Sequence, residues 1–357
     1  MTPVVTPSEP LEMVAGGLDD TGLDLLSSAP AVVVDLDSEV NNAEVKRLSA
    51  LLEGAPVVLI GMSENGARDN ESILGLDVLM CSSAGGARPW VECGAQLHEM
   101  VEQLCTSISA SPDASVAFAQ LLRVGEFSSP AEAVIAESWV YSLLQGGATY
   151  SEWLHRRSER TRKPRPDHSV VRVDRNGDVL TVTLNRPEVH NAYGTRMRDE
   201  LVEAFRLVDI DRTISRVILC GEGPSFSSGG DLDEFGTAPA PVEAHGIRTR
   251  RNAGIALAAI AERVEVYVHG TCVGAGVELP AFANRVVAHS ATSFLLPEIS
   301  MGLVPGAGGT SSIPRRIGRH RAAYFGLSGR PIDSQTALAW GLIDEIADDG
   351  PLRGDTQ

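Results

Sequence analysis

The sequence predicts an α/β fold in the C-terminal half of the chain, with a helical segment placed before it. Strand-like and helix-like runs alternate from Val170 to about Ile346, an order typical of α/β folds. Asn176-Gly177 lies between two alternating apolar runs, which is the strongest short signal for a β-hairpin. Residues 89–157 instead carry apolar side chains at helical spacing. These three observations separate a helical part from an α/β part.

The composition is that of an ordinary globular protein. The 357 residues are 43% hydrophobic and 22% charged, and the length allows two domains. The formal net charge of −17 argues against nonspecific binding to nucleic acid or to an anionic membrane. Residues 1–20 show no secretory signal, and no run approaches the roughly 20 apolar residues of a membrane span. We therefore expect a soluble, cytoplasmic protein with no nucleic-acid or membrane partner.

The cysteines indicate neither a disulfide framework nor a metal site. Their number is odd and their spacing is not that of metal ligands, so reduced thiols are expected. The five cysteines are Cys81, Cys93, Cys105, Cys220 and Cys272.

The first part, residues 1–88, is predicted to be a small strand–helix–strand unit with a flexible N-terminal arm. Residues 1–20 are rich in proline, glycine and acidic residues, which suggests a loose arm. Apolar runs at 31–36 and 57–62 are expected to be strands, with a helix at 41–52 between them. A third apolar run covers residues 73–80.

The second part, residues 89–157, is predicted to consist of helices. One helix should begin at Ser129, because Pro130 follows it and Glu132 lies in the first turn. Residues 158–167 are basic and almost devoid of apolar side chains, which indicates a linker. The α/β part then occupies residues 168–357, with helices expected at 195–209 and 248–263.

Two glutamates and two glycine-rich turns are the candidate chemical groups. Glu278 and Glu298 lie in apolar runs, where a carboxylate is costly unless it has a partner or a task. The turns at 225–232 and 274–276 are made of small residues, which leave backbone N–H groups open to a ligand. Two such donors on one carbonyl oxygen form an oxyanion hole, which suits enolate chemistry. The alternative interpretation is two tight turns and two salt-bridged glutamates.

Residues 170–346 resemble the crotonase (enoyl-CoA hydratase/isomerase) superfamily. Five blocks match it in order: Leu184-Asn-Arg-Pro-Glu-Val-His-Asn-Ala192, Phe226-Ser-Ser-Gly-Gly-Asp-Leu232, Val268-His-Gly-Thr-Cys-Val-Gly-Ala-Gly-Val-Glu-Leu279, Pro297-Glu-Ile-Ser-Met-Gly-Leu-Val-Pro-Gly-Ala-Gly-Gly-Thr310, and Ser328-Gly-Arg-Pro-Ile-Asp333 with Ala337-Leu-Ala-Trp-Gly-Leu-Ile-Asp344. The resemblance implies a crotonase-like ββα spiral core.

The resemblance also implies roles for individual residues. Ser228 and Ala275 would give the backbone donors of the oxyanion hole. Glu278 would act as base toward water and Glu298 would deliver a proton to the α-carbon. The substrate would be a coenzyme A thioester, with no permanently bound cofactor and no metal. The residues implied to bind CoA are Arg186, Asn191, Ala192, Gly229, Asp231 and Leu232.

The chain departs from the family in the order of its parts. Crotonases continue for several helices beyond the last matching block, whereas here about ten residues follow it. Residues 89–157 resemble those missing helices, so the N-terminal extension is interpreted as a degenerate partial copy of the same fold. We expect residues 89–157 to serve as a lid and oligomerisation segment, in a homo-oligomer that is a trimer or a dimer of trimers.

Retention of both glutamates favours an enoyl-CoA hydratase. Two alternatives within the family are a Δ3,Δ2-enoyl-CoA isomerase, which needs Glu298 alone, and a cofactor-independent CoA-ester oxygenase. An alternative of another class is a non-catalytic crotonase-fold partner subunit.

Overall fold

The computed structural model describes residues 4–5, 30–37, 56–67, 71–126, 128–157, 167–238 and 240–349. Its main sheet has six strands in the order β14-β11-β9-β8-β7-β6. The predicted hairpin is confirmed, because β6 (Val171–Asn176) pairs antiparallel with β7 (Val179–Leu184). The other strand pairs are parallel and follow one another across the sheet, β7 with β8, β8 with β9, β9 with β11 and β11 with β14. The strands beyond β7 are β8 (Arg216–Gly221), β9 (Val264–Val268), β11 (Arg285–Ala288) and β14 (Glu345–Ile346).

A small second sheet carries the glycine turn and the loop before Glu298. Its strands are β10 (Thr271–Val273), β12 (Ser293–Leu295) and β13 (Ile332–Asp333). β10 pairs parallel with β12, so the turn after Val273 lies beside the chain that leads to Glu298. The alternation of strands and helices predicted for the second half of the chain is therefore confirmed. A separate small sheet carries the glycine-rich turn that follows Val273.

The N-terminal part forms a five-stranded parallel sheet in the order β1-β2-β3-β4-β5. The strands are β1 (Val4–Val5), β2 (Ala31–Asp35), β3 (Val58–Ser63), β4 (Val78–Cys81) and β5 (Val91–Glu92). Part of the expected loose arm is thus a strand, because Val4–Val5 pairs with β2. The run at 73–80 divides into a 3-10 helix, η1 (Glu71–Gly75), and β4. The helix predicted at 41–52 lies outside the described residues.

Helices fill residues 97–156. They are α4 (Leu97–Ala110), α5 (Pro112–Gly125), α6 (Pro130–Leu144) and α7 (Ala148–Arg156). The predicted start of α6 is confirmed: the Ser129 side chain accepts from the N–H of Glu132, whose side chain accepts in return from the N–H of Ser129.

The C-terminal half contains longer and shorter helices around its sheets. The helix predicted over 248–263 is instead two helices, α9 and α10, because the Asn252 side chain caps a new helix by accepting from the N–H of Ile255. The α-helices of this half are α8 (Thr195–Ile210), α9 (Pro241–Arg250), α10 (Ala253–Ala258), α11 (Ala275–Glu278), α12 (Gly309–Ile317), α13 (Arg319–Ser328) and α14 (Ser334–Trp340). Short 3-10 helices are η2 (Gly94–Gln96), η3 (Pro187–Val189), η4 (Leu232–Glu234), η5 (Ala261–Arg263), η6 (Pro280–Phe282) and η7 (Glu298–Met301).

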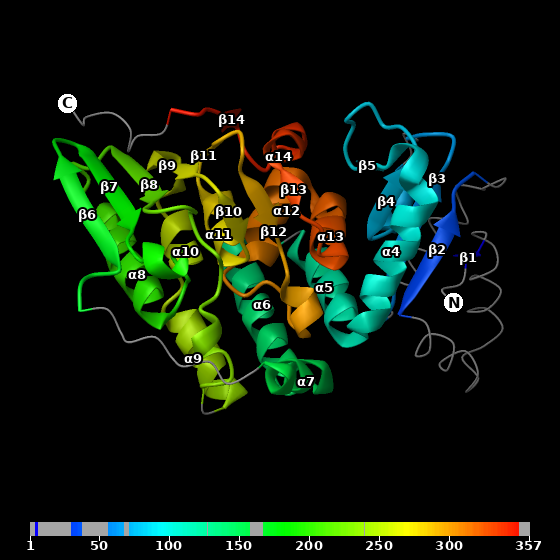
Figure 1. Ribbon diagram of the computed structural model, residues 1–357, viewed down its shortest axis with the longest axis horizontal. Helices are drawn as coiled ribbons and strands as arrows, with labels where there is room; N and C mark the ends of the chain where they lie inside the picture. The colour runs from blue at the N-terminus through cyan, green and yellow to red at the C-terminus, as the bar shows by residue number, and fades with distance from the viewer. Residues whose placement is uncertain are drawn as a thin grey trace.

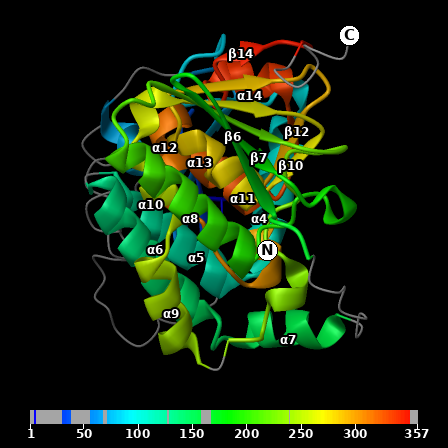
Figure 2. The ribbon, with the colours of Figure 1, turned by 90° about the vertical axis from the view of Figure 1, so that its left-hand side faces the viewer.

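The N-terminal sheet and the main sheet lie at opposite ends of the molecule, with helices α5, α6, α12 and α13 between them (Figure 1). One hydrophobic core runs from Val58 of the N-terminal sheet through these helices to Val266 of the main sheet. The far face of the N-terminal sheet has its own smaller core, which includes Leu59 and Trp90. In the view turned by 90°, α6 and α9 lie side by side along one face (Figure 2). The helical segment is therefore packed into the C-terminal half.

Buried arginines of α13 hold the N-terminal part in place. Arg321 is 2% exposed, and its guanidinium donates to the carbonyl oxygens of Trp90 (3.0 Å) and Gly86 (2.9 Å). Arg319 donates to the carbonyl of Leu76 at 3.0 Å. Arg319 and Arg321 therefore make packing contacts within the chain. Within the described residues, no helix combines the length and the apolar character that crossing a membrane requires.

Candidate active site

One cavity brings both candidate glutamates together with residues from both halves of the chain. Its volume is about 380 Å³, and Glu278, Glu298 and Ala275 line it. Another part of its wall comes from the helical segment, through Tyr141 of α6 and Tyr150 of α7. Helices α6 and α7 therefore help to enclose the two carboxylates.

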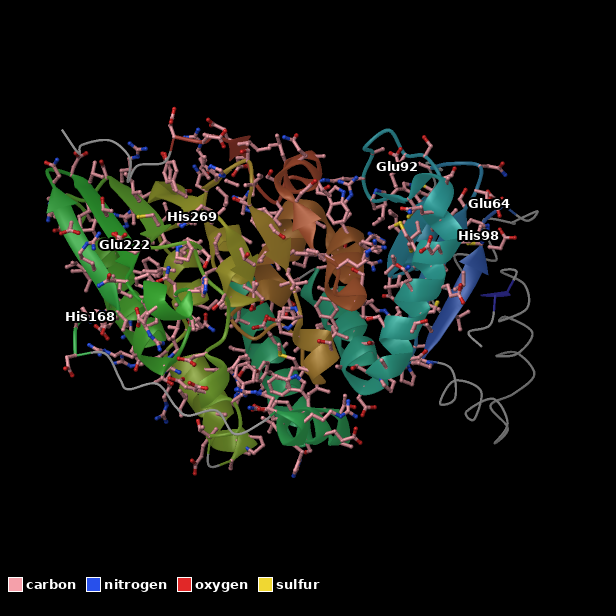
Figure 3. All side chains as sticks on the ribbon, viewed as in Figure 1. Glu64, Glu92, His98, His168, Glu222 and His269 are labelled. Atoms are coloured by element: carbon pink, nitrogen blue, oxygen red, sulfur yellow. The ribbon has the colours of Figure 1, made fainter. Side chains whose placement is uncertain are left out.

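A separate cavity of about 480 Å³ lies at the carboxyl ends of β8, β9 and β11. Glu222 and His269, labelled in Figure 3, belong to its wall. It contains neither candidate glutamate nor either glycine turn of the predicted site. We therefore place the candidate active site in the 380 Å³ cavity.

Glu278 is held by a glycine-rich turn on one side and faces the cavity on the other. It ends the short helix α11, which the left-handed Gly274 (φ 49) separates from β10. Its Oε2 accepts from the N–H groups of Ala307 (2.7 Å) and Gly309 (2.9 Å). Burial raises the pKa of Glu278, whereas these two N–H groups lower it. The second oxygen, Oε1, makes no hydrogen bond to a described residue and can act on a ligand.

Glu298 approaches the same point with much less support. It begins η7, and its Oε2 is shielded from solvent without a hydrogen-bond partner among the described residues. Burial and the neighbouring Glu278 charge both raise the pKa of Glu298 well above its ordinary value. A Cβ at Gly274 would collide with Glu298 Oε1 and lie 3.8 Å from Glu278 Oε1. The two oxygens therefore converge beside Gly274, where only glycine leaves room.

The two glycine-rich turns run in parallel beside the carboxylates. Ser227 forms a parallel bridge with Cys272, and the N–H of Val273 donates to the Ser227 carbonyl at 3.0 Å. Continuing this register by three residues places Gly230 opposite Ala275. Both residues line the cavity, and neither N–H donates to an acceptor among the described residues. Gly230 and Ala275 therefore offer a pair of backbone donors.

The prediction that Ser228 supplies one of these donors is wrong. Its N–H already donates to the carbonyl of His190 at 2.8 Å, and Ser228 does not line the cavity. The left-handed conformation of His190 (φ 54) turns that carbonyl toward the glycine-rich turn. The donor two residues later, at Gly230, is the one left open.

Asn191 is also not a ligand-binding residue in this geometry. It is 0% exposed and left-handed (φ 53), a conformation that asparagine tolerates. Its side-chain amide donates to the carbonyls of Glu222 (2.8 Å) and Ser225 (3.0 Å), and its Oδ1 accepts from the N–H of Arg186. Asn191 thus ties the loop before it to the first glycine-rich turn.

Of the other residues predicted to bind CoA, Asp231 lines the cavity. Its carboxylate accepts from Arg186 Nη1 at 2.8 Å, in an ion pair whose side chains are 15% and 14% exposed. The Leu232 carbonyl accepts from Arg157 at 2.6 Å. Arg186, Ala192, Gly229 and Leu232 lie outside the cavity wall, and CoA binding by them stays a prediction.

A third carboxylate, Glu137 of α6, completes the site. It is 1% exposed and accepts from the N–H groups of Gly308 (2.8 Å) and Thr310 (2.9 Å) and from the Thr310 hydroxyl (2.7 Å). Glu137 and Glu278 thus alternate along the four N–H groups of residues 307–310. Burial and the charge of Glu278 both raise the pKa of Glu137. Its position in a helical run gave no sequence signal of this role.

Comparisons with known proteins relate the C-terminal half of the chain to one family. The family model described as "Enoyl-CoA hydratase/isomerase" matches residues 174–354. The chain is 34% identical over 183 residues to the 1,2-epoxyphenylacetyl-CoA isomerase of Escherichia coli (strain K12), covering 50% of this chain and 70% of that protein. It is 35% identical over 178 residues to the 2,3-dehydroadipyl-CoA hydratase of the same strain, covering 50% and 69%. A crystal structure of an enoyl-CoA hydratase from Mycobacterium smegmatis aligns with a TM-score of 0.48 at 27% identity, over 50% of this chain and 70% of that chain.

The chain belongs to the enoyl-CoA hydratase/isomerase family, as the sequence blocks predicted. Its C-terminal half is a crotonase-fold unit with helices placed N-terminal to it, and family membership makes it an acyl-CoA enzyme. Helices α4 to α7 lie outside the matched region, although α6 and α7 contribute to the cavity wall.

Proposed function

We propose that the protein adds water across the double bond of a 2-enoyl-CoA thioester. The main support for this proposal is that Glu278 Oε1 and Glu298 Oε1 converge beside Gly274. The backbone donors of Gly230 and Ala275 line the same cavity. The relatives include both a hydratase and an isomerase. The presence of two carboxylates, each with an oxygen toward the same point, favours hydration because water addition needs a base and an acid.

The two backbone N–H groups would bind the thioester oxygen. Negative charge develops on that oxygen when the α-carbon acquires enolate character, and two fixed donors stabilise it by several kcal/mol. Ala275 begins α11, and the first N–H of a helix has no intrahelical acceptor. The N–H of Gly230 is the second donor of the proposed oxyanion hole, in place of the predicted N–H of Ser228.

The unequal environments of the glutamates assign their roles. Glu278 receives two N–H donors, which favour its ionised form, so it is the base that removes a proton from water. Glu298 Oε2 has no donor and its raised pKa favours the protonated form, so it is the acid. The hydroxyl adds to the β-carbon and the proton of Glu298 adds to the α-carbon. The addition leaves Glu278 protonated and Glu298 ionised, so passage of one proton from Glu278 to Glu298 by way of solvent returns both carboxyls to their starting forms. No bound cofactor takes part in this scheme.

The test is product analysis with crotonyl-CoA. Purified protein treated with a chelator should convert it to 3-hydroxybutyryl-CoA, with deuterium entering at the α-carbon in heavy water. The same protein should be assayed with a 3-enoyl-CoA, which an isomerase would convert to the 2-enoyl ester. Isomerisation without hydration would replace the proposal by the isomerase, and no turnover of either ester would favour a non-catalytic subunit.

We also propose that the protein is a homo-oligomer. Helix α6 exposes Ile135, Trp139 and Leu143 at successive intervals of four residues, and Trp139 is 61% exposed. Val242 of the adjacent helix α9 extends this apolar surface. Association of copies through this surface would remove it from water. Sedimentation velocity should show a species larger than the 37.9 kDa chain, and Trp139→Glu should weaken it.

Replacing Glu137 by glutamine should leave the acid limb of kcat/KM for hydration close to its wild-type pH. The charge of Glu278 raises the pKa of Glu137, whereas the pKa of Glu278 is raised by burial and lowered by the N–H groups of Ala307 and Gly309. Glu278 therefore ionises first, while Glu137 is still protonated, and a neutral amide at position 137 keeps that charge state. Glu262→Gln, at an exposed position, is the control. A large shift of the acid limb to lower pH in Glu137→Gln would show instead that Glu137 is ionised when Glu278 titrates.

A further inference from the structure

The wall of the cavity formed by α6, α7 and α9 carries hydrogen-bond donors that the proposed hydration does not use. Arg248 of α9, Tyr141 of α6 and Tyr150 of α7 all line the cavity. We call these three residues the donor wall. None of them belongs to the glycine turns or to the pair of reacting carboxylates.

Arg248 differs from the other arginines of the cavity in its partners. Arg198 pairs with Asp199 at 2.8 Å, and Arg251 pairs with Glu203 at 3.1 Å. The described acceptors of the Arg248 guanidinium are all neutral: the hydroxyl and carbonyl of Ser138 (3.1 and 3.3 Å), the Ser142 hydroxyl and the Gln145 amide oxygen (3.4 Å). Among the described residues no carboxylate forms an ion pair with this guanidinium, and Glu137 acts on it only as a neighbouring charge.

The tyrosines hold this cation close to the reacting groups. The Arg248 guanidinium lies 4.5 Å from the centre of the Tyr141 ring. That ring packs against Gly306, where a Cβ would come within 2.5 Å of Tyr141 Cε2. Gly306 directly precedes the N–H groups that bind Glu278, so the donor wall adjoins the carboxylate end of the cavity.

Both hydroxyl groups are available to a ligand. Tyr150 Oη lies near Gln145 and Gly236, but it is buried without a partner in hydrogen-bonding geometry among the described residues. Tyr141 makes no hydrogen bond to a described side chain or carbonyl. Burial raises the pKa of both phenols, so they remain protonated donors at neutral pH.

We propose that the donor wall binds a carboxylate carried by the acyl group, so that the substrate is the CoA monothioester of an unsaturated dicarboxylic acid. This rests on the proposed acyl-CoA function. A plain hydrocarbon chain would leave the guanidinium without an ion-pair partner and the hydroxyls unpaired, and a buried polar group without a partner is unfavourable. A carboxylate accepts from all three donors and balances the charge, and such charge-assisted bonds are about twice as strong as neutral ones.

The test uses saturated CoA esters, which bind but cannot be hydrated. Calorimetry should compare succinyl-, glutaryl- and adipyl-CoA with butyryl-, pentanoyl- and hexanoyl-CoA on the full chain. We expect at least one dicarboxylic ester to bind about tenfold or more tighter than its length-matched partner, since sites built for polar groups reject analogues lacking them by large factors. Arg248→Met should abolish this preference, and Tyr150→Phe should reduce it while preserving the ring.

The controls separate recognition from folding and from the function itself. Arg248→Lys keeps the charge but not the planar fork that bridges Ser138 and Ser142, so it should retain part of the preference. A Tyr150→Phe variant that folds as the wild type tests the wall without touching the α6–α9 contacts of Arg248. Equal binding of both ester series by the wild type, or an undiminished preference in Arg248→Met, would overturn the donor wall alone. Failure of every CoA ester to bind would overturn the acyl-CoA function as well.

Discussion

Replacing Glu278 by glutamine is expected to lower the rate of hydration by about 100-fold or more. The amide can keep its oxygen at the place of Oε2, where it still accepts from the N–H groups of Ala307 and Gly309. Its NH₂ group then occupies the place of Oε1 and cannot take a proton from water. The substitution therefore removes the base with little change of structure, and general bases commonly contribute 10²–10⁴-fold.

Glu298→Gln should cause a loss of similar size, because it removes the proton donated to the α-carbon. Steady-state hydration of crotonyl-CoA and binding of a saturated acyl-CoA should be measured together for both variants. Binding should change little, and the exposed Glu262→Gln should match the wild type. Normal hydration by Glu278→Gln would assign water activation to another group.

The same variants distinguish hydration from isomerisation. An isomerase that uses Glu298 alone would keep its activity in Glu278→Gln and lose it in Glu298→Gln. A hydratase needs both carboxylates in one step, so the two variants should be equally inactive. Loss confined to Glu298→Gln would therefore favour the isomerase.

Removing the N-terminal helices should abolish activity completely. A chain of residues 165–357 lacks Glu137, so the N–H groups of Gly308 and Thr310 lose their acceptors inside the site. It also lacks Phe118, which packs directly against Gly326 of α13, and the Tyr141 and Tyr150 part of the cavity wall. Exposed apolar surface and an open cavity should make this fragment poorly soluble and inactive.

Two measurements make this expectation specific. Co-expression of residues 1–157 with 165–357 should restore hydration, because the contacts between the parts are noncovalent. A protease site inserted at 158–166 and cut after folding should leave activity intact. A soluble, fully active 165–357 fragment would show that the helices are dispensable for the chemistry.

Several features of the protein follow from short sequence patterns because their physical causes are local. The hairpin at Asn176-Gly177 is set by a two-residue turn, and the start of α6 is set by the reciprocal bonds of Ser129 and Glu132. The paired glutamates were identifiable because a carboxylate in an apolar run needs a reason. The family also follows from the sequence, because its five blocks are short local motifs between residues 184 and 344, inside the region that the family model matches.

The identity of the oxyanion donor required the fold. Within a run of serines and glycines, local geometry does not show which N–H remains open. The carbonyl of His190, which lies on another loop, takes the N–H of Ser228 and leaves that of Gly230 to the cavity. The assignment therefore depends on a long-range hydrogen bond.

Glu137 and Arg248 show the same limit of local patterns at the site. Glu137 meets Gly308 across 171 residues of sequence, and Arg248 meets Ser138 across 110. In the sequence each is one polar residue in a helix, which is most often a solvated surface position. The helical patterns, and the position of Glu278 in an apolar run, can be recognised from neighbouring residues in the sequence. The partners of Glu137 and Arg248 are determined only by the tertiary structure, because they depend on how α6 packs against α9 and α12.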